Sequence, residues 1–451
     1  MRAPEVITDS GDEQVWQRVA AVDVAKASGM VCVRTPDEDR PGQRVSRVWE
    51  VSSTMNAILE LADHLRCQQV QQVTMEATSD YWRCFFYVFE AAGLNVVLVN
   101  AREAKNVPGR PKTDKLDAVW LAKLTEKGLL RASFVPPAPI RQLRDYTRCR
   151  SDLVGERTRF WNRLEKLLED ALIKVSTVAS KLDTVSVRAM LEALIAGERN
   201  PRVLADLARG RMRIKRAALI EALNGRFDDH HAELARLLLD NIDSLDRQIT
   251  ALTGRIEELI CAIPQAWGVD ADGTTGPDAG HQTGAPVQPA VKRLAQVPGI
   301  SEETAQTIIA EIGLDMGRFP TPNHLVAWAR VTPRTVQSGT RSHTDKAGKG
   351  NPYLKGTLGQ VVAAAANTNS FIGERYRRLV RRKVSKPKAI VAVSRSILVI
   401  IWHPLADPNN PYHDLGADFH TNHTDKAKQL HNHVRAIKAL GFNITVEPQA
   451  A

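Results

Sequence analysis

Aromatic residues and cysteines are scarce in this chain of 451 residues, and each scarcity argues against a class of protein. Phe, Trp and Tyr together make up 5% of the sequence, which disfavours a protein that works mainly by stacking single-stranded bases. The cysteines lie far apart and form no CxxC pair, so neither a zinc ribbon nor a disulfide scaffold is supported and a reducing compartment fits. They are Cys32, Cys67, Cys84, Cys149 and Cys261.

Long apolar runs are also missing. Residues 1–14 contain no apolar stretch of the signal-peptide type, and the longest apolar run, residues 396–402, is too short to span a bilayer. We therefore expect a soluble, cytoplasmic protein with no membrane partner.

Positive charge, in contrast, is in excess. The chain has 61 Lys and Arg against 51 Asp and Glu, a formal net charge of +10. Such a surplus favours an anionic partner, most often nucleic acid, over a merely basic soluble protein. The cations gather in residues 140–175, 340–355 and 375–388. The side chains that we expect to contact nucleic acid are Arg144, Arg148, Arg157, Lys346, Lys349, Arg377, Arg378, Arg381, Arg382 and Lys383.

Hydrophobic periodicity predicts an α/β domain followed by helical ones. Within residues 15–130 the signals follow the order βββαβαβα, which predicts a mixed sheet covered by helices. Residues 140–262 are predicted to be helical, and residues 263–290, rich in Gly, Pro, Thr and Asp, form a linker or insert. A last, mainly helical domain spans 291–402 and a polar extension spans 403–451.

The middle region combines a long helix with a heptad seam. One helix is expected over 140–175, and a second lies near 232–261, where apolar residues alternate at steps of four and three. The seam either packs on the first helix as a hairpin within one chain or pairs two protomers as a coiled coil. Its members are Leu238, Ile242, Leu245, Ile249, Leu252, Ile256 and Leu259.

Four acids lie where predicted strands end or a helix begins. Asp23 and Glu76 end two strands of the sheet, and Asp114 and Asp117 stand three residues apart at a helix start, so both face one side. This is the layout of a ribonuclease H-type nuclease core, in which carboxylates hold two divalent cations that act on a phosphodiester. For Asp114 and Asp117 the alternative is that they only balance the helix dipole.

Several strings in this region resemble one family. They are DVAK at 23–26, EATSDYW at 76–82, VNAR at 99–102 and, most specifically, KTDKLDAVWLAK at 112–123. These strings are similar to those of the DEDD insertion-sequence transposases guided by a bridge RNA, the insertion-sequence one-hundred-and-ten family, which includes a pilin-gene invertase. The resemblance covers nearly the whole chain from about residue 15, except residues 263–290. It implies that residues 15–130 are a RuvC-like domain whose four acids bind Mg²⁺, with two metal ions in the site.

The resemblance also points to a nucleophile in the second half. Residues 294–301 form a helix-hairpin-helix-like turn, and residues 333–339 and 349–354 resemble the family's transposase domain. From the residues alone Ser338 is an ordinary turn serine, but the family's serine attacks DNA and forms a phosphoserine link. This assigns Ser338 as nucleophile, with Ser342 as the weaker alternative. The chain departs from the family at Lys355, where Arg is common, and the two residues differ at a bidentate phosphate contact.

The sequence thus leads to three hypotheses. The first, implied by the resemblance, is a bacterial recombinase that uses bridge RNA to pair donor and target double-stranded DNA. Its serine and metal-binding acids would meet from different protomers of a homo-oligomer, a dimer that becomes a tetramer in synapsis. The second is a two-metal Holliday-junction nuclease that hydrolyses with water. The third is a noncatalytic nucleic-acid-binding scaffold.

Overall fold

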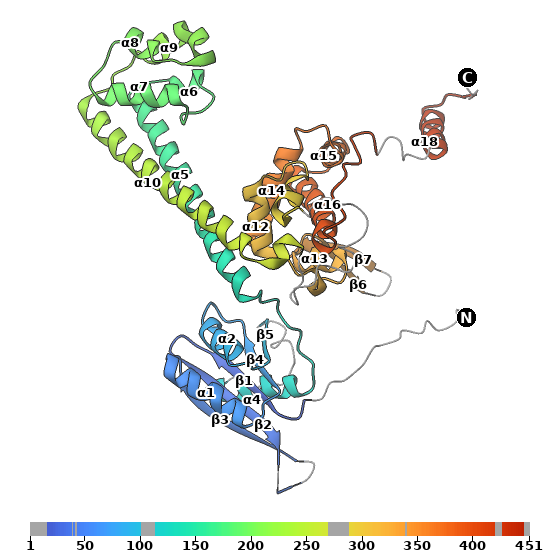
Figure 1. The fold of residues 1–451 in the computed structure, drawn as a ribbon. Helices are drawn as coiled ribbons and strands as arrows, with labels where there is room; N and C mark the ends of the chain where they lie inside the picture. Colours follow the sequence, from blue (N-terminus) through green and yellow to red (C-terminus); the bar gives the residue numbers. More distant parts are fainter. Residues whose placement is uncertain are drawn as a thin grey trace. The chain divides into compact units, whose positions relative to one another are not determined.

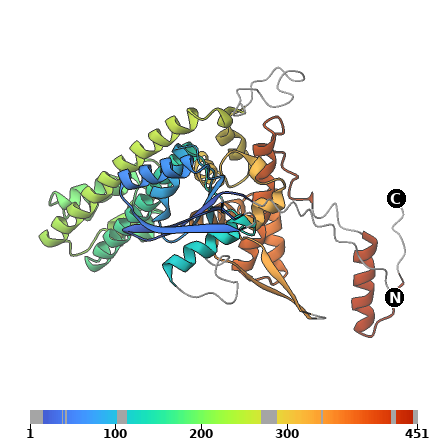
Figure 2. The same cartoon turned by 90° about the horizontal axis from the view of Figure 1, so that it is seen from below.

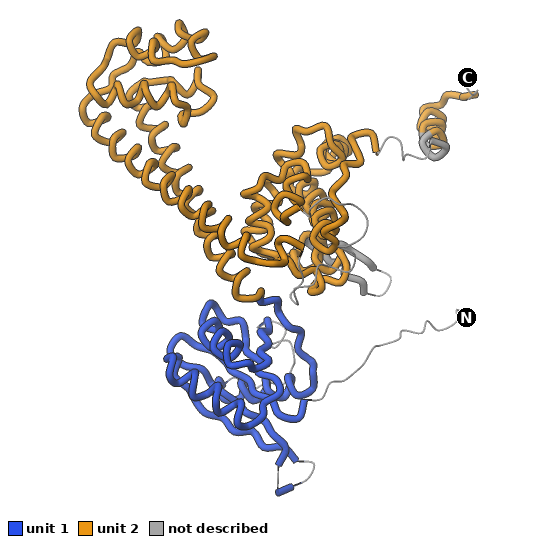
Figure 3. Tube along the Cα trace, in the orientation of Figure 1, with its two compact units in different colours: residues 1–135 blue, residues 136–451 orange. Residues whose placement is uncertain are grey.

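The structure, a computed structural model, describes residues 16–37, 39–40, 43–100, 113–268, 288–338, 341–419 and 426–445. For residues 334–338, 341–347, 426–429 and 432 it describes the backbone alone. The chain divides into two compact units, residues 1–135 and 136–451, which we treat separately (Figure 3).

The first unit is built on a five-stranded mixed sheet with the order β3-β2-β1-β4-β5 (Figure 1). β1 to β3 form an antiparallel meander, whereas β4 and β5 run parallel to β1. The mixed α/β architecture predicted from the sequence is confirmed, in the predicted element order. The strands are β1 (Val19–Val24), β2 (Ser28–Pro36), β3 (Arg44–Ser52), β4 (Gln72–Glu76) and β5 (Val96–Val99).

Helices cover both faces of this sheet. α1 (Met55–Cys67) and α2 (Trp82–Ala91) pack on one face, where their buried side chains meet Val22 and Met75. α4 (Asp114–Glu126) packs on the other face, against Ala21 and the strands around it. Figure 2 shows α4 on the opposite side of the sheet from α1. Because side chains alternate along a strand, Asp23 lies on the α4 face together with Ala21.

The second unit begins with a pair of long helices (Figure 1). α5 (Ala138–Asp170) and α10 (Asp229–Cys261) lie side by side in one chain, with the seam residues Ile242, Leu245 and Ile256 buried. Pairing between protomers stays a prediction. The expectation of one helix over 140–175 is wrong at its end, because α5 ends at Asp170 and Leu172 takes a left-handed φ of 59°.

A small helical domain, not expected from the sequence, joins the far ends of these two helices (Figure 1). We call residues 171–227 the tip domain. A core that includes Leu168, Leu191 and Leu204 joins it to α5 and α10. Its elements are α6 (Val175–Val178), α7 (Val185–Ile195), α8 (Pro201–Asp206), the 3₁₀ helix η1 (Gly210–Lys215) and α9 (Arg216–Ala222).

The rest of the second unit is mainly helical, as predicted. The basic, glycine-containing sequence of residues 340–354 favours a loop, but the structure has a β-hairpin in this region, β6 (Pro333–Ser338) and β7 (Arg341–Ala347). Of the predicted linker, residues 269–287 lie outside the described residues. The other elements are η2 (Pro264–Trp267), α11 (Ala290–Ala295), α12 (Glu302–Ile312), η3 (Met316–Arg318), α13 (Pro322–Trp328), α14 (Pro352–Ala365), α15 (Phe371–Arg381), α16 (Lys386–Ala406) and α18 (Lys426–Ala439).

α16 is the central helix of this domain. By length and composition alone it could cross a membrane, but the same property is found in core helices of soluble proteins. Val393, Ile397 and Ile401 are fully buried, and the helix contacts α11, α13, α14 and α15. The structure therefore accounts for its apolar sequence by packing within the domain.

Candidate active site

Asp23 and Glu76 lie next to each other on neighbouring strands. The parallel register of β1 and β4 pairs Val22 with Met75, so the next residues of the two strands, Asp23 and Glu76, share one level of the sheet. Residues at one level of a parallel pair project to the same face. This face carries Ala21 and is covered by α4. The structure thus brings these two predicted acids together at the carboxyl ends of β1 and β4.

Asp114 and Asp117 lie on the side of α4 that faces the sheet. Thr113 caps the helix by accepting a hydrogen bond from the backbone N–H of Leu116 at 3.3 Å. Asp114 stands four residues before Ala118, and Asp117 four before Leu121, and both of these apolar residues pack on the sheet. Positions four apart share one helix face. The two acids therefore lie one helical turn before these apolar residues on the same face of α4. They extend that face toward the carboxyl ends of the sheet's parallel strands.

Burial differs among the four acids, and their oxygens are not gathered into one closed cluster. Glu76 is 6% exposed, Asp23 and Asp117 are half-buried, and Asp114 is exposed. Among the described residues, no three of these carboxylates have ligand atoms within 4.8 Å of one another. The donor set still fits a hard divalent cation, since all four groups offer carboxylate oxygens. The segment that leads into this helix, residues 101–112, lies outside the described residues.

A different group does have its ligand atoms within 4.8 Å, namely Asp170, His230 and His231 in the second unit. His231, however, caps α10. Its Nδ1 accepts the backbone N–H of Asp228 at 3.2 Å, and its Nε2 lies 3.2 Å from Asp170 Oδ2. With Nδ1 as acceptor, Nε2 carries the proton and donates it to Asp170. A metal on Nε2 would leave the ring anionic, so this group is a helix cap.

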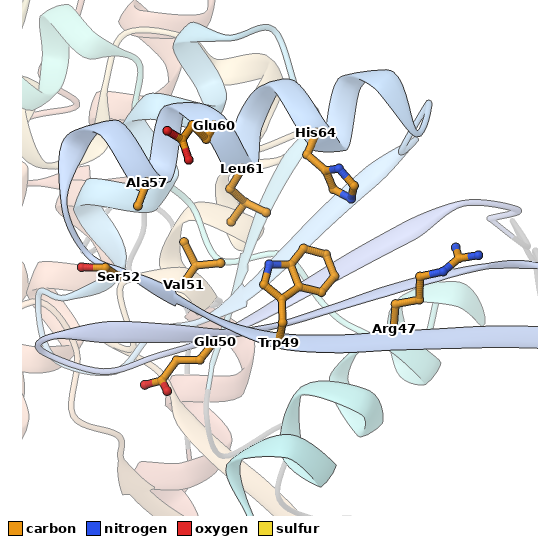
Figure 4. Close-up of a pocket in the computed structure, with 9 residues that line it drawn as sticks. All are labelled: Arg47, Trp49, Glu50, Val51, Ser52, Ala57, Glu60, Leu61 and His64. Carbon is orange, nitrogen blue, oxygen red and sulfur yellow. The ribbon is translucent and has the colours of Figure 1, made fainter.

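An open pocket of about 530 Å³ lies between β3 and α1 (Figure 4). The ring of His64 meets Trp49 edge-on, with centroids 5.5 Å apart. Leu61 of α1 also lines the pocket, and α1 covers the sheet face opposite to the one that α4 covers. None of the four predicted acids lines this pocket, so it is separate from the candidate metal centre.

The candidate serines lie at the closed end of the β6–β7 hairpin. In the register, Ser338 stands opposite Arg341 and Gln337 opposite Ser342. Both serines are thus adjacent across one short ladder, but their side chains, like that of Lys346, lie outside the described residues. Of the predicted cations nearby, Lys349 is exposed in the loop that follows β7.

Lys355 and a cation that the sequence analysis did not name, Arg330, support the base of this hairpin. Arg330, with a left-handed φ of 54°, packs against Gly348, where a Cβ would lie 3.0 Å from its Cδ. Lys355 donates a 2.7 Å hydrogen bond from Nζ to the carbonyl of Gly348. Burial and the neighbouring Arg330 lower the pKa of Lys355. The Lys at this family-variant position therefore holds the loop that follows β7.

The predicted nucleic-acid contacts on α5 are engaged within the protein. Arg148 makes a bidentate pair with Glu311 of α12, at 2.7 and 2.8 Å. Arg144 donates to the carbonyls of Ala310 and Glu311, at 3.0 and 2.8 Å. Arg157 pairs with Asp246 of α10. These three guanidinium groups join α5 to its neighbours, and phosphate contact through them stays untested.

On α15 the predicted cations fall on two stripes. On one stripe Glu374 binds both Arg377 and Arg381, and Arg377 also donates to the carbonyls of Ala366 and Thr368. The other stripe comprises Arg375, Arg378 and Arg382. None of these three forms an ion pair with a described residue. Of the other predicted cations here, Lys383 is exposed just beyond the helix.

The second stripe approaches a further guanidinium on α16. The buried Nε of Arg375 has no hydrogen-bond partner among the described residues. Burial, together with the charges of Arg395 and Arg378, lowers the pKa of Arg375. Arg395 reaches Asn323 at 3.4 Å. The guanidinium groups of Arg378 and Arg395 thus both lie within electrostatic range of that of Arg375, a suitable arrangement for an anion.

Two family models match different parts of the chain. The DEDD transposase model of the IS110 type matches residues 20–173, and the model "Transposase IS116/IS110/IS902 family" matches residues 291–377. An uncharacterized 43.6 kDa protein of insertion element IS110 from Streptomyces coelicolor is 26% identical over 317 residues, which cover 69% of this chain and 74% of that protein.

Two solved structures of RuvC from Thermus thermophilus are also similar. The first is 12% identical, with a TM-score of 0.21, and covers 26% of this chain and 100% of its own. The second, in complex with a Holliday junction, is 11% identical, with a TM-score of 0.20, and covers 26% and 99%. The two matched family models together span more than half of the sequence. The chain belongs to the IS110 family of transposases.

Proposed function

We propose that this transposase cleaves and rejoins DNA strands at sites selected by a bound guide RNA, with Ser338 as nucleophile. The observation that carries the proposal is the placement of the four acids. Asp23 and Glu76 share one level at the edge of the sheet, and the acids of α4 continue its sheet-contacting stripe toward that edge. The transposase models matched in both halves supply the reaction class.

The acids would hold divalent cations, and we propose Mg²⁺ as the ion and two as the number. Such ions, when bound, would neutralise charge on the scissile phosphate and stabilise the negative charge on the attacking and leaving oxygens. Glu76, buried at a strand end, offers a fixed carboxylate, whereas Asp114 is exposed at the first turn of α4. The half-buried Asp23 and Asp117 lie between these extremes.

In the proposed reaction, Ser338 Oγ attacks the phosphorus of a DNA phosphodiester. The Oγ–P bond forms as a P–O bond to a deoxyribose oxygen breaks, and the serine proton ends on that leaving oxygen. Rejoining is the same exchange in reverse, with a hydroxyl from another strand attacking the phosphoserine. Each step exchanges one phosphate ester for another, so no external energy source is required.

We propose that each reaction site combines the acids of one protomer with the serine of another. A mixing experiment tests this arrangement. Glu76→Gln and Ser338→Ala proteins should each be inactive alone, and a mixed oligomer should recover strand exchange, because one of its composite sites has both groups intact. No recovery in a mixture that forms hetero-oligomers would contradict a composite site.

The substitution Ser338→Ala tests the nucleophile. We expect loss of strand exchange and of the covalent protein–DNA adduct, whereas Ser342→Ala should retain both. If Ser338→Ala still cleaves DNA by hydrolysis, the protein is a metal-dependent nuclease of the kind that uses water. If neither Ser338→Ala nor Asp114→Asn alters recombination, the protein does not perform this chemistry.

Guide RNA use is tested by sequencing the RNA that copurifies with the full chain. One defined RNA species, whose altered sequence redirects the DNA sites, is the expected result. Recombination of donor and target duplexes by protein freed of RNA would overturn RNA guidance, although the serine chemistry could still hold.

A further inference from the structure

The tip domain carries a concentrated positive segment that lies outside both matched family ranges. Five of the eight residues from 209 to 216 are cations, and none is acidic. The two matched ranges end at residue 173 and resume at residue 291. The segment forms η1 and its flanks, between α8 and α9 of the tip domain (Figure 1). All five cations are exposed.

Three hydrogen bonds, one from the backbone and two from side chains, hold this segment to its surroundings. The N–H of Arg209 donates to the buried Ser186 Oγ at 2.9 Å. Lys215 Nζ donates to the carbonyl of Val178 at 2.7 Å, and Arg213 Nε to the carbonyl of Ala208 at 3.2 Å. The segment is therefore presented on a fixed support, which reduces the entropy lost when a partner binds.

The five cations of the segment fall into three groups. Arg213 and Lys215 donate to the backbone carbonyls named above. Arg216 pairs with Asp206, which neutralises it. Arg209 and Arg211 form no ion pair with any described residue. Between the cations, Ile214 is 89% exposed. Unpaired guanidinium groups beside an exposed aliphatic side chain match the surface of a nucleic-acid duplex, where phosphates flank a groove that accepts apolar side chains.

We propose that Arg209 and Arg211 of the tip domain bind the phosphodiester backbone of a nucleic-acid duplex, with Ile214 at the groove. A membrane surface fits less well, because η1 has cations at every second position and so has no apolar face. The inference rests on the proposed function only for the class of partner, and it adds a binding surface in the second unit to the acids of the first.

The test measures how binding by the full chain depends on salt. The probes are fluorescein-labelled DNA and RNA duplexes of one sequence and length. Arg211→Gln should reduce the slope of log K against log salt by about 0.9 per lost phosphate contact on duplex DNA. Arg209→Gln/Arg211→Gln should roughly double that loss. Arg216→Gln removes the same charge from a paired position and should leave the slope unchanged.

A slope reduced on the RNA probe alone identifies the guide RNA as the partner. A slope reduced on the DNA probe alone identifies the DNA substrate, and a slope reduced on both probes identifies a surface that both partners share. If the Arg209→Gln/Arg211→Gln variant has an unchanged circular dichroism spectrum and wild-type slopes on both probes, the inference is overturned. It is also overturned if Arg216→Gln reduces the slope as much as Arg211→Gln does. Loss of binding to anionic vesicles with unchanged slopes would identify a membrane surface and also overturn it. Failure of strand exchange by the wild-type chain contradicts the proposed function and leaves these slopes interpretable.

Discussion

Arg148 of α5 makes a bidentate ion pair with Glu311 of α12, whose carboxylate is fully buried. The same carboxylate accepts a hydrogen bond from Asn351, which caps α14 directly after the serine hairpin. The guanidinium of Arg148 lies over the ring of Tyr353, with its Cζ 4.7 Å from the ring centroid. One acid of α12 therefore joins α5 to the start of α14, the helix that follows the hairpin.

Substitution of this acid should destabilise the second unit strongly. Glu311→Ala leaves Arg148 and Arg144 without their carboxylate, and breaking a buried pair costs about 3–5 kcal/mol. Arg157→Ala, whose pair with Asp246 is more exposed, should cost at most about 1 kcal/mol. Urea unfolding followed by circular dichroism measures both. Equal effects of the two variants would contradict the role of Glu311.

The two stripes of α15 should contribute differently to nucleic-acid binding. Arg382→Gln and Arg378→Gln should each reduce the salt slope on duplex DNA by about 0.9, because neither group forms an ion pair with a described residue. Arg381→Gln changes the same charge but removes a group already paired with Glu374, so its slope should match the wild type. A larger effect of Arg381→Gln than of Arg382→Gln would show the assignment to be wrong.

The acid centre should be needed for chemistry but not for folding. Glu76→Gln should lower the rate of strand cleavage at least about 100-fold, equivalent to about 2.7 kcal/mol of transition-state stabilisation. Asp63→Asn is the control, because this exposed acid lies on α1, on the other face of the sheet. Cleavage in the presence of excess chelator would argue against metal use. Retained cleavage by Glu76→Gln would exclude this carboxylate.

Cys32 should make the first unit sensitive to alkaline pH. Burial raises the pKa of this thiol from 9.0 to about 11. The folded state therefore keeps the proton that the unfolded state loses above pH 9, and stability falls as pH rises from 9 toward 11, by about 2–3 kcal/mol in total. Unfolding of wild type and Cys32→Ala across this range isolates the effect. A constant difference between them would contradict it.

Thiol labelling gives a second readout of the same residue. Cys67, Cys84, Cys149 and Cys261 are exposed, whereas Cys32 is fully buried. In the native protein, four thiols should react promptly with a disulfide reagent, and the fifth only after unfolding.

The order of elements in the first unit was predictable because each strand has its own pattern. Alternation along Val19–Val24 puts Val22 in one core and Ala21 in the other, and the same alternation assigns Asp23 to the face of α4. The Thr113 cap and the acids after it mark the start of α4. Local signals thus locate the four acids on their elements, but how closely their oxygens approach depends on tertiary packing.

The tip domain was not predictable because the end of α5 has no local signal. Leu172 turns left-handed without a glycine or proline, and long-range bonds fix the break: Lys174 N–H to the carbonyl of Ala222, and Arg226 N–H to that of Ala171. Gly225 is the one visible clue, since a Cβ there would lie 2.5 Å from the carbonyl oxygen of Ala171. A close approach of this kind is invisible until the partner backbone is known.

The sequence also could not separate structural from available cations. Arg148 and Arg378 both belong to dense basic tracts, yet Arg148 pairs with an acid more than 150 residues away and Arg378 forms no ion pair with a described residue. Charge density predicts that a tract contacts an anion, but the anion can be a distant carboxylate of the same chain. Only the fold shows which guanidinium groups are already neutralised.

The length of α5 sets a spacing between the two ends of the helical pair. From Arg148, at the contact with α12, to Asp170, where the tip domain begins, the helix advances by about 22 residues, or about 33 Å. One turn of duplex DNA measures about 34–36 Å. Groups at the two ends of this stretch of α5 can therefore meet the same side of a DNA duplex one turn apart. Inserting or deleting residues in α5 and α10 would change which phosphates these groups reach together.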